Sequence, residues 1–271
     1  MYLLSACYPP ILPGMRILGI IFSVLFMVTI ALASIHFWGL SQPYLPYDNK
    51  FFTGDRPWVI APWEQSFFIE QKKDLILWAN VYRNQHMQLL VAPTAEKVLK
   101  SRERAQISNP TRPLLTELLQ KFPTQKMILN IVDNVEEIQA QLEQALAAEK
   151  SSERIMIQSD FNNVLTATKD LLPRLVYGST PSDTMRLKSF QSMWILSASP
   201  FKGDVFLSSL VVSKRKSLNE GIAEELHRRF KKIILGPLQN TEEAELALRL
   251  GADGLYAEKP EWLLQWLREK K

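Results

Sequence analysis

Residues 232–267 read KIILGPLQNTEEAELALRLGADGLYAEKPEWLLQWL, and this stretch decides the fold of the chain. Residues 233–235 and 254–257 are apolar runs, each long enough for one buried strand. Between them, residues 241–250 carry apolar side chains at helical spacing after the capping hydroxyl of Thr241, and a glycine follows in the position of a left-handed cap. A proline then begins another amphipathic helix. This order predicts a β/α repeat with parallel strands and a right-handed connection.

The same alternation of apolar runs and amphipathic segments extends back to residue 58. We interpret residues 75–81 and 87–92 as a strand pair, and the other strands as separated mostly by helices. About eight parallel-type strands predict an α/β protein with a (β/α)8 TIM-type barrel, and an open doubly wound sheet is the alternative. Strands are predicted at 58–61, 75–81, 87–92, 127–132, 154–158, 174–177, 205–212, 233–235 and 254–257. Helices are predicted at 113–122, 134–150, 161–172, 182–190, 218–231, 241–250 and from 260 onward.

Composition limits the classes of function open to this chain. Its 271 residues hold 32 Lys and Arg against 28 Asp and Glu, a net charge of +4. This mild excess favours an anionic lipid or a protein as a partner, and we expect no nucleic-acid partner. A single cysteine excludes an internal disulfide framework and a cysteine-based zinc site. With three scattered histidines as well, we predict no metal and no cofactor.

An apolar segment near the amino terminus predicts a membrane anchor. Residues 17–40 contain no Asp, Glu, Lys or Arg and are long enough to span a bilayer as one helix. Arg16 precedes the segment, so we expect residues 1–16 in the cytoplasm and a single-pass protein with its globular part outside the cytoplasm. Residues 41–56 then form a linker, and residues 57–271 form the barrel. The alternative is a signal peptide cleaved near Ala31-Leu32-Ala33.

At the carboxyl end, Asn240-Thr241-Glu242-Glu243-Ala244 precedes a Gly-x-Asp-Gly turn at residues 251–254 and then Lys259-Pro260-Glu261. Together with several other segments, this order resembles the glycerophosphodiester phosphodiesterase family. The resemblance covers residues 58–267 and implies a TIM-type barrel that cleaves phosphodiesters. Further matching segments are Met127-Ile128-Leu129-Asn130-Ile131, Arg154-Ile155-Met156-Ile157-Gln158-Ser159, Pro173-Arg174-Leu175 and Leu226-His227-Arg228-Arg229.

The family's catalytic residues are not matched in this chain. In the family, carboxylates hold a divalent cation and two histidines act as acid and base. The resemblance places residues 62–64 at the first histidine's His-Arg-Gly turn and residues 92–93 at the second histidine's His-Asp pair. Strand 75–79, where the family has Glu-x-Asp, is wholly apolar, and Val132 stands where the third carboxylate is expected, with Asp133 one place on. We therefore assign no catalytic residue and no metal ligand.

Remaining polar residues define two candidate sites. Polar side chains near strand ends form a candidate pocket, although such residues are often loop starters. Basic residues form a candidate patch for anionic headgroups, although a solvated helix end is the simpler reading. The pocket residues are Asn130, Asp133, Gln158, Tyr177, Gln239 and Asn240. The patch residues are Lys214, Arg215, Lys216, Arg228, Arg229, Lys231 and Lys232.

The other ionisable residues carry weaker hypotheses. His86 and His227 are interpreted as solvated side chains rather than catalytic bases. Glu64, Glu70 and Asp74 are the substitutes that a displaced metal site would use.

Three functions remain open from the sequence. We prefer a membrane-anchored, catalytically inactive barrel that binds a ligand or a partner outside the cytoplasm. The first alternative is an active phosphoric diester hydrolase with displaced residues, which would need Mg²⁺ or Ca²⁺. The second is a barrel used only for assembly. An open polar barrel mouth would favour a ligand, and a closed mouth would favour assembly.

Overall fold

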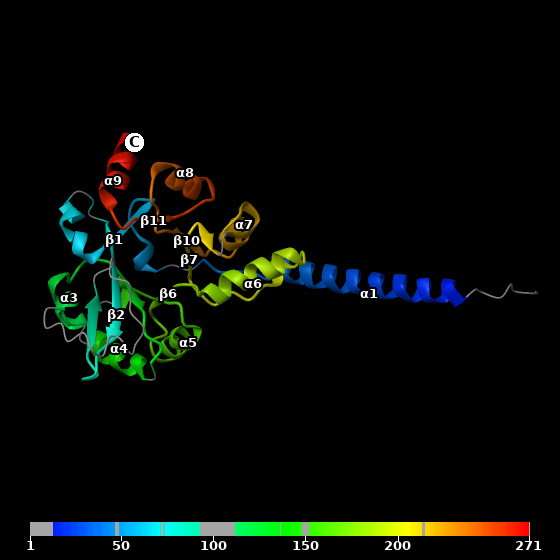
Figure 1. Cartoon of the computed structure of the whole chain (residues 1–271), viewed down its shortest axis with the longest axis horizontal. Helices are drawn as coiled ribbons and strands as arrows, with labels where there is room; N and C mark the ends of the chain where they lie inside the picture. Colours follow the sequence, from blue (N-terminus) through cyan, green and yellow to red (C-terminus); the bar gives the residue numbers. More distant parts are fainter. Residues whose placement is uncertain are drawn as a thin grey trace, which may run out of the picture.

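A nearly closed barrel with one long projecting helix makes up the computed structural model, which describes residues 13–46, 49–70, 72, 74–92, 112–135, 137–147, 152–212 and 215–270 (Figure 1). The long helix is α1 (Pro13–Ser41), and it extends away from the barrel. The predicted helix followed by an α/β barrel is confirmed.

The barrel consists of eight parallel strands in the order β1, β2, β4, β5, β6, β7, β10 and β11. β1 pairs with both β2 and β11, and an isolated parallel bridge between Gly178 and Val205 joins β6 to β7. This ring excludes the open doubly wound sheet. The bounds are β1 (Trp58–Pro62), β2 (Ile76–Arg83), β4 (Met127–Ile131), β5 (Ile155–Ser159), β6 (Val176–Tyr177), β7 (Val205–Ser208), β10 (Lys232–Leu235) and β11 (Gly254–Tyr256).

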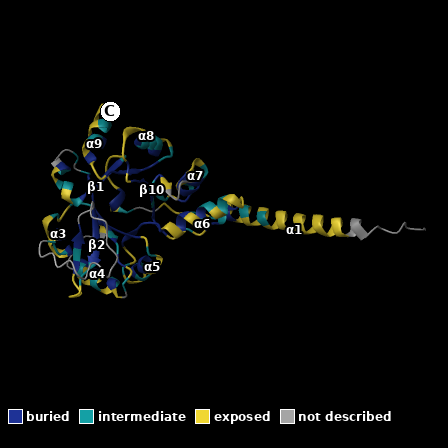
Figure 2. Cartoon of the chain, in the orientation of Figure 1, coloured by how far each residue is buried: buried dark blue, intermediate teal, exposed yellow. Residues whose placement is uncertain are grey.

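Helices surround the ring, and the buried residues lie inside this shell (Figure 2). β3 (Leu89–Ala92) pairs antiparallel with β2, which confirms the predicted strand pair. Short 3₁₀ segments η2 (Trp63–Glu70), η3 (Ser152–Arg154) and η4 (Leu196–Ala198) occupy three of the connections. In the described ranges these helices are α3 (Leu115–Lys121), α4 (Ile138–Ala147), α5 (Asn162–Leu171), α6 (Pro181–Ser192), α7 (Glu220–Arg228), α8 (Thr241–Arg249) and α9 (Pro260–Glu269).

Alternation along the strands builds two separate cores. Leu77 and Leu129 face outward and belong to the larger core between barrel and helices. Ile60, Ile76 and Ile128 face inward and belong to the core inside the barrel. Successive strand side chains point to opposite faces, so each strand is buried on both sides and reads as a continuous apolar run.

Aromatic side chains seal the end of the barrel where the strands begin, which we call the amino end. η1 (Lys50–Phe52) precedes β1 and carries the buried side chains of Phe51 and Phe52. The Phe52 ring lies 5.6 Å from the Trp58 ring, and Trp58 is fully buried. Residues that the sequence assigned to a linker therefore contribute to the barrel core.

Two predicted elements differ from the structure. The predicted strand 205–212 ends at Ser208, and β8 (Val211–Val212) instead forms a hairpin with β9 (Arg215–Lys216). Hydrogen bonds from Ser217 to the carbonyls of Ser209 and Leu210 hold the chain in this turn. The predicted helix at 134–150 begins later than expected, because α4 covers Ile138–Ala147, and residues 148–150 lie outside the described residues.

The cap of α8 is one residue earlier than predicted. The side chain of Asn240, not the hydroxyl of Thr241, accepts a hydrogen bond from the Glu243 amide at 2.9 Å. At the other end Gly251 has φ of +79°, which confirms the predicted left-handed cap.

Candidate functional site

The mouth of the barrel is the edge where the strands end, and it is the usual site of function in this fold. β2 places Trp78 and Asn80 there, β4 places Asn130, and β11 places Tyr256. The Trp78 and Tyr256 rings stack with centroids 4.9 Å apart at 17°. Asn80 Oδ1 accepts hydrogen bonds from Trp78 Nε1 at 3.0 Å and from Asn130 Nδ2 at 2.8 Å. These interactions lock an aromatic and amide cluster into the mouth.

Gln158 of β5 continues the cluster toward β6. Its Nε2 atom donates to the Ser179 carbonyl at 3.0 Å. Gly178 allows this placement, because a Cβ atom there would lie 1.7 Å from Gln158 Oε1. Trp78 is only 8% exposed and Gln158 only 3%, so the mouth is filled by side chains of the chain itself.

Tyr256 is the ionisable group inside this cluster. Burial raises the pKa of its phenol far above the usual 10, and the charges of Glu258 and Glu64 add to the rise. Both carboxylates are exposed and follow the ends of β11 and β1. The phenol is therefore neutral at physiological pH.

The alkaline stability of the protein should depend on Tyr256. Above about pH 10 an unfolded chain releases the phenol proton while the folded chain retains it, so rising pH favours unfolding. We expect Tyr256→Phe to remove this contribution, so that the wild-type protein loses stability relative to the variant between about pH 9 and about pH 11. Urea unfolding across this range measures the difference. A difference independent of pH would contradict the burial of the phenol.

The structure separates the candidate metal ligands. Glu64 follows β1 at the mouth, whereas Asp74 precedes β2 at the amino end and accepts a hydrogen bond from the Asp55 amide at 3.4 Å. One cation cannot bridge these two carboxylates, and the Glu70 side chain lies outside the described part. Within the described ranges, no group of three or more His, Cys, Asp or Glu side chains is placed to hold a metal ion.

The histidines are equally dispersed. His36 belongs to α1, and His86 is exposed at the tip of the β2–β3 hairpin. His227 lies at the end of α7, with Nε2 3.9 Å from Asp253 Oδ2. Asp253 directly precedes β11, so this pair lies at the amino end of the barrel, away from the mouth.

Of the predicted pocket residues, the structure brings Asn130 and Gln158 together at the mouth. Asp133 is buried behind the end of β4, where its carboxylate accepts a hydrogen bond from the Arg83 amide at 2.8 Å. Gln239 and Asn240 are exposed, and Asn240 caps α8.

Tyr177 does not belong to the pocket. It faces the outer core, and its hydroxyl donates to the carbonyls of Leu172 at 2.8 Å and Thr168 at 3.0 Å. The prediction failed because Tyr177 and Val176 differ by one place along β6, and one place reverses the face.

Three residues of the mouth were absent from the predicted pocket: Trp78, Asn80 and Tyr256. Ile76 and Trp78 belong to the inner core, so both side chains point into the barrel. Because side chains alternate along a strand, Asn80 points to the same face as Ile76, and this alternation could have identified Asn80 from the sequence.

The predicted basic patch is divided between opposite ends of the barrel. Lys216 lies in the hairpin that follows β7, and Arg228 lies at the end of α7, which precedes β10. Lys231 is half-buried beside Asp204 at 3.7 Å, and burial lowers the pKa of its ammonium group. Arg215 is described only in its backbone, Lys232 is half-buried, and Lys214 lies outside the described residues.

Arg229 is not available for a headgroup, because it is only 5% exposed. Its Nε atom lies 2.6 Å from Glu225 Oε1. Its terminal nitrogens donate to the carbonyls of Leu196, Ser197 and Ser199. The guanidinium group thus holds η4 against α7.

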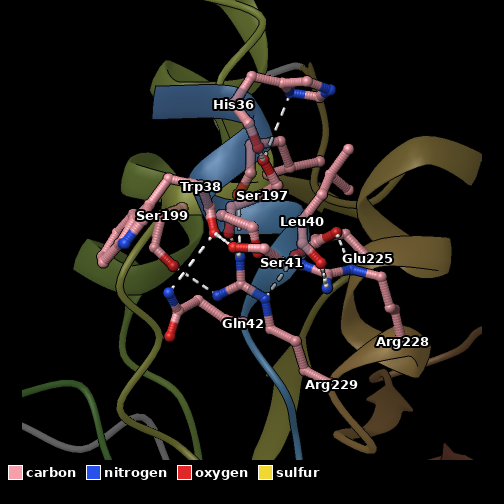
Figure 3. A network of polar contacts seen from close by, with 12 residues as sticks. His36, Trp38, Leu40, Ser41, Gln42, Ser197, Ser199, Glu225, Arg228 and Arg229 are labelled. Atoms are coloured by element: carbon pink, nitrogen blue, oxygen red, sulfur yellow. Dashed lines mark hydrogen bonds and ion pairs between the residues drawn. The ribbon is translucent and has the colours of Figure 1, made fainter. Parts of the chain in front are cut away.

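The same region fixes α1 to the barrel (Figure 3). Arg228 donates to the carbonyls of Gly39 at 3.3 Å and Leu40 at 3.4 Å, which lie in the last turn of α1. The Ser197 hydroxyl donates to the His36 carbonyl at 2.8 Å. Gly39 packs so tightly that a Cβ atom would lie 2.4 Å from the Ser197 carbonyl carbon. α1 is therefore docked on the barrel rather than loosely tethered.

This docking site lies at the amino end of the barrel. η4 follows α6 and precedes β7, and in β/α units the helices return the chain to the edge where the next strand begins. The mouth consequently lies at the opposite end from α1. Beyond the dock, Ile17–Ser41 is one helix long and apolar enough to cross a membrane, and most of its residues are exposed (Figure 2).

No protein-family model and no curated protein matches the chain. Among solved structures, it is similar to the glycerophosphoryl diester phosphodiesterase domain of a Mycobacterium tuberculosis protein, with a TM-score of 0.61 and 12% identity over 79% of this chain and 100% of that chain. It is also similar to a glycerophosphodiester phosphodiesterase from Parabacteroides distasonis (TM-score 0.58, 10% identity, 78% and 97% covered). A third is a phosphodiesterase from Oleispira antarctica, solved with the product sn-glycerol-3-phosphate (TM-score 0.56, 12% identity, 79% and 97% covered). The chain therefore has the barrel fold of the glycerophosphodiester phosphodiesterases.

Proposed function

We propose that this chain is a membrane-anchored barrel that does not hydrolyse glycerophosphodiesters and works by binding a protein partner. One observation carries the proposal: Ile76 and Trp78 are the inward side chains of residues 75–79, the segment where the family resemblance expects carboxylate ligands. Phosphodiester hydrolysis of this type needs a cation to offset phosphate charge and groups to move protons. A stacked Trp78–Tyr256 pair bridged to neutral amides supplies neither.

The filled mouth favours a protein partner over a small ligand. Small-molecule sites are usually concave and largely pre-formed. Here Trp78, Asn80, Gln158 and Tyr256 are each at most 8% exposed, so a ligand would have to displace packed side chains. A barrel whose mouth is closed in this way presents its rim and its helices as the surfaces for recognition.

The anchor supports a role at a membrane. The helix Ile17–Ser41 has the length and hydropathy of a single span, and its dock at the amino end turns the mouth away from the bilayer. Arg16, on the far side of the span, favours an amino terminus in the cytoplasm and a barrel outside it. In this arrangement a partner would reach the rim of the mouth from the aqueous side.

The test is hydrolysis of glycerophosphodiesters by the full chain in lipid nanodiscs with Mg²⁺ or Ca²⁺. We expect no turnover that a chelator removes. The alternative hydrolase would have to recruit Glu64 and Glu258, the two carboxylates that act on Tyr256 at the mouth. Chelator-sensitive turnover that disappears in a Glu64→Gln/Glu258→Gln double variant would refute the proposal. If the proposal holds, the wild-type protein and the double variant should both show only background hydrolysis.

A further inference from the structure

A groove lies between α1 and the end of α6. It has a volume of about 450 Å³ and is lined by one face of α1, from Thr29 to Phe37, and by residues 192–194. We call it the α1–α6 groove. We propose that it holds an acyl chain of a bilayer phospholipid and that Trp194 enters the membrane beside it. This inference rests on the proposed membrane anchor.

The depth of the groove follows from the length of the span. A hydrocarbon core of about 30 Å takes roughly 20 helical residues at 1.5 Å each. Counted from Ile17, the first residue of the span, about 20 residues reach His36. Leu32 and Ala33 line the groove and lie within this length. The groove is therefore at the barrel-side boundary of the hydrocarbon core.

The surface of the groove consists mainly of apolar atoms. The Thr29 hydroxyl donates to the Leu25 carbonyl at 2.9 Å, and the Ser192 hydroxyl donates to the Lys188 carbonyl at 3.0 Å. His36 Nδ1 lies 3.3 Å from the Ser197 hydroxyl. Because these polar atoms already have partners in the chain, they do not need to bond an occupant, and an apolar one fits beside them.

The turn at residues 193–194 exposes apolar surface where a soluble domain would be polar. Trp194 is 85% exposed and Met193 is 44% exposed. Trp194 has φ of +62°, a conformation that a bulky residue rarely adopts. Phe37 and Trp38 are also more than 60% exposed at the same end of α1. Aromatic side chains at this level match the interfacial belt of membrane proteins.

The dock keeps the groove formed. Arg228 binds the last carbonyls of α1, and Gly39 packs against Ser197 with no room for a side chain. Because η4 follows the 192–194 turn after one residue, the turn cannot separate from α1 without breaking these contacts. α1 and Trp194 therefore enter the bilayer as one unit, which fixes the orientation of the barrel relative to the membrane.

Spin labels on the full chain in nanodiscs test the depth. In a Cys7→Ser background, one nitroxide is placed by Trp194→Cys in the turn after α6, by Met185→Cys on α6, or by Phe26→Cys within the span. Met185 is 59% exposed and Phe26 is 67% exposed. We expect labels at 194 and 26 to be accessible to oxygen and shielded from a water-soluble nickel chelate, and the label at 185 to show the reverse.

The labels also separate two kinds of failure. A label at 194 as accessible to nickel as the label at 185, with residue 26 shielded, would overturn the groove and leave the anchor standing. Nickel access at residue 26 would overturn both the anchor and the groove.

Photo-crosslinking tests the acyl chain itself. A phospholipid with a diazirine in its acyl chain should label the peptide that contains residues 192–194. Ala33→Trp fills the groove and should reduce this labelling several-fold. Ala31→Trp makes the same substitution two residues away, on another face of α1, and should leave the labelling unchanged. Equal labelling in both variants would overturn the site. Labelling replaced by crosslinks between two copies of the chain would assign the groove to a second α1 and would also overturn it.

Discussion

Glu225→Ala is expected to lower the free energy of unfolding by about 3–5 kcal/mol, because it leaves a buried guanidinium group without its carboxylate. Glu225 Oε1 lies 2.6 Å from Arg229 Nε and 2.7 Å from Arg228 Nη2. Glu225 is 8% exposed and Arg229 5%, so water cannot take the place of the lost partner. The remaining contacts of Arg229 to three backbone carbonyls do not neutralise its charge.

The control for this variant is Glu224→Ala. Glu224 precedes Glu225 on α7 and carries the same charge, but its side chain is exposed. Its removal should change stability by no more than about 0.5 kcal/mol. Urea unfolding of the full chain in detergent micelles measures both variants. Equal effects at 224 and 225 would show that the Glu225–Arg229 pair does not hold η4 and α7 together.

The same variant should loosen the anchor. Arg229 holds η4, and η4 carries Ser197, which binds the His36 carbonyl of α1. Loss of Glu225 should therefore speed backbone amide exchange at residues 196–199 more than in the rest of the barrel. Uniform exchange across the barrel would indicate a general loss of stability without a specific effect on the dock.

Trp78→Ala is expected to cost about 3–5 kcal/mol, the usual range for removing a large aromatic side chain from a core. Trp78 stacks on Tyr256 and donates to Asn80, so the substitution also leaves a buried amide oxygen with one donor fewer. Inside a barrel, neighbouring strands cannot move together to fill the space, because their hydrogen bonds fix their separation.

Trp194→Ala is the matched control, since it makes the same change at a side chain that is 85% exposed. It should alter the stability of the barrel by no more than about 0.5 kcal/mol. Trp78→Phe retains a ring against Tyr256 and should recover part of the loss. If Trp78→Ala were as stable as the wild-type protein, the Trp78 side chain would not be packed tightly in the barrel mouth, and the proposal that it fills a former ligand site would be wrong.

Local patterns in the sequence were sufficient for the barrel. The apolar runs at 127–131 and 233–235 are buried on both faces, as parallel strands require, and the segments between them are amphipathic. The glycine at 251 and the proline at 260 mark helix boundaries that the structure confirms. These features depend on neighbours within a few residues, so one sequence suffices to find them.

The candidate site was only partly predictable. Asn130 and Gln158 were identified because they end strands, and both lie at the mouth. Tyr177 also ends a strand, but its side chain points to the outer core. This direction was hard to predict, because β6 has only two residues and shows no alternating pattern. The pairing of Trp78 with Tyr256 is not visible in the sequence, because the two rings that the barrel stacks together lie far apart along the chain.

The sequence alone determined three features: the β/α alternation, the apolar span, and the absence of the family's His-Arg-Gly and Glu-x-Asp motifs. Each of these depends only on residue types at short spacing. Tertiary structure settled which side chains meet. Arg228 and Arg229 read as a surface patch, yet in the folded chain one binds the carbonyls at the end of α1 and the other is buried against Glu225. The physical reason is that a charged side chain binds whichever partner the fold brings within reach, and that partner can be a neighbour on the same helix, such as Glu225, or a carbonyl far away in the sequence, such as that of Gly39.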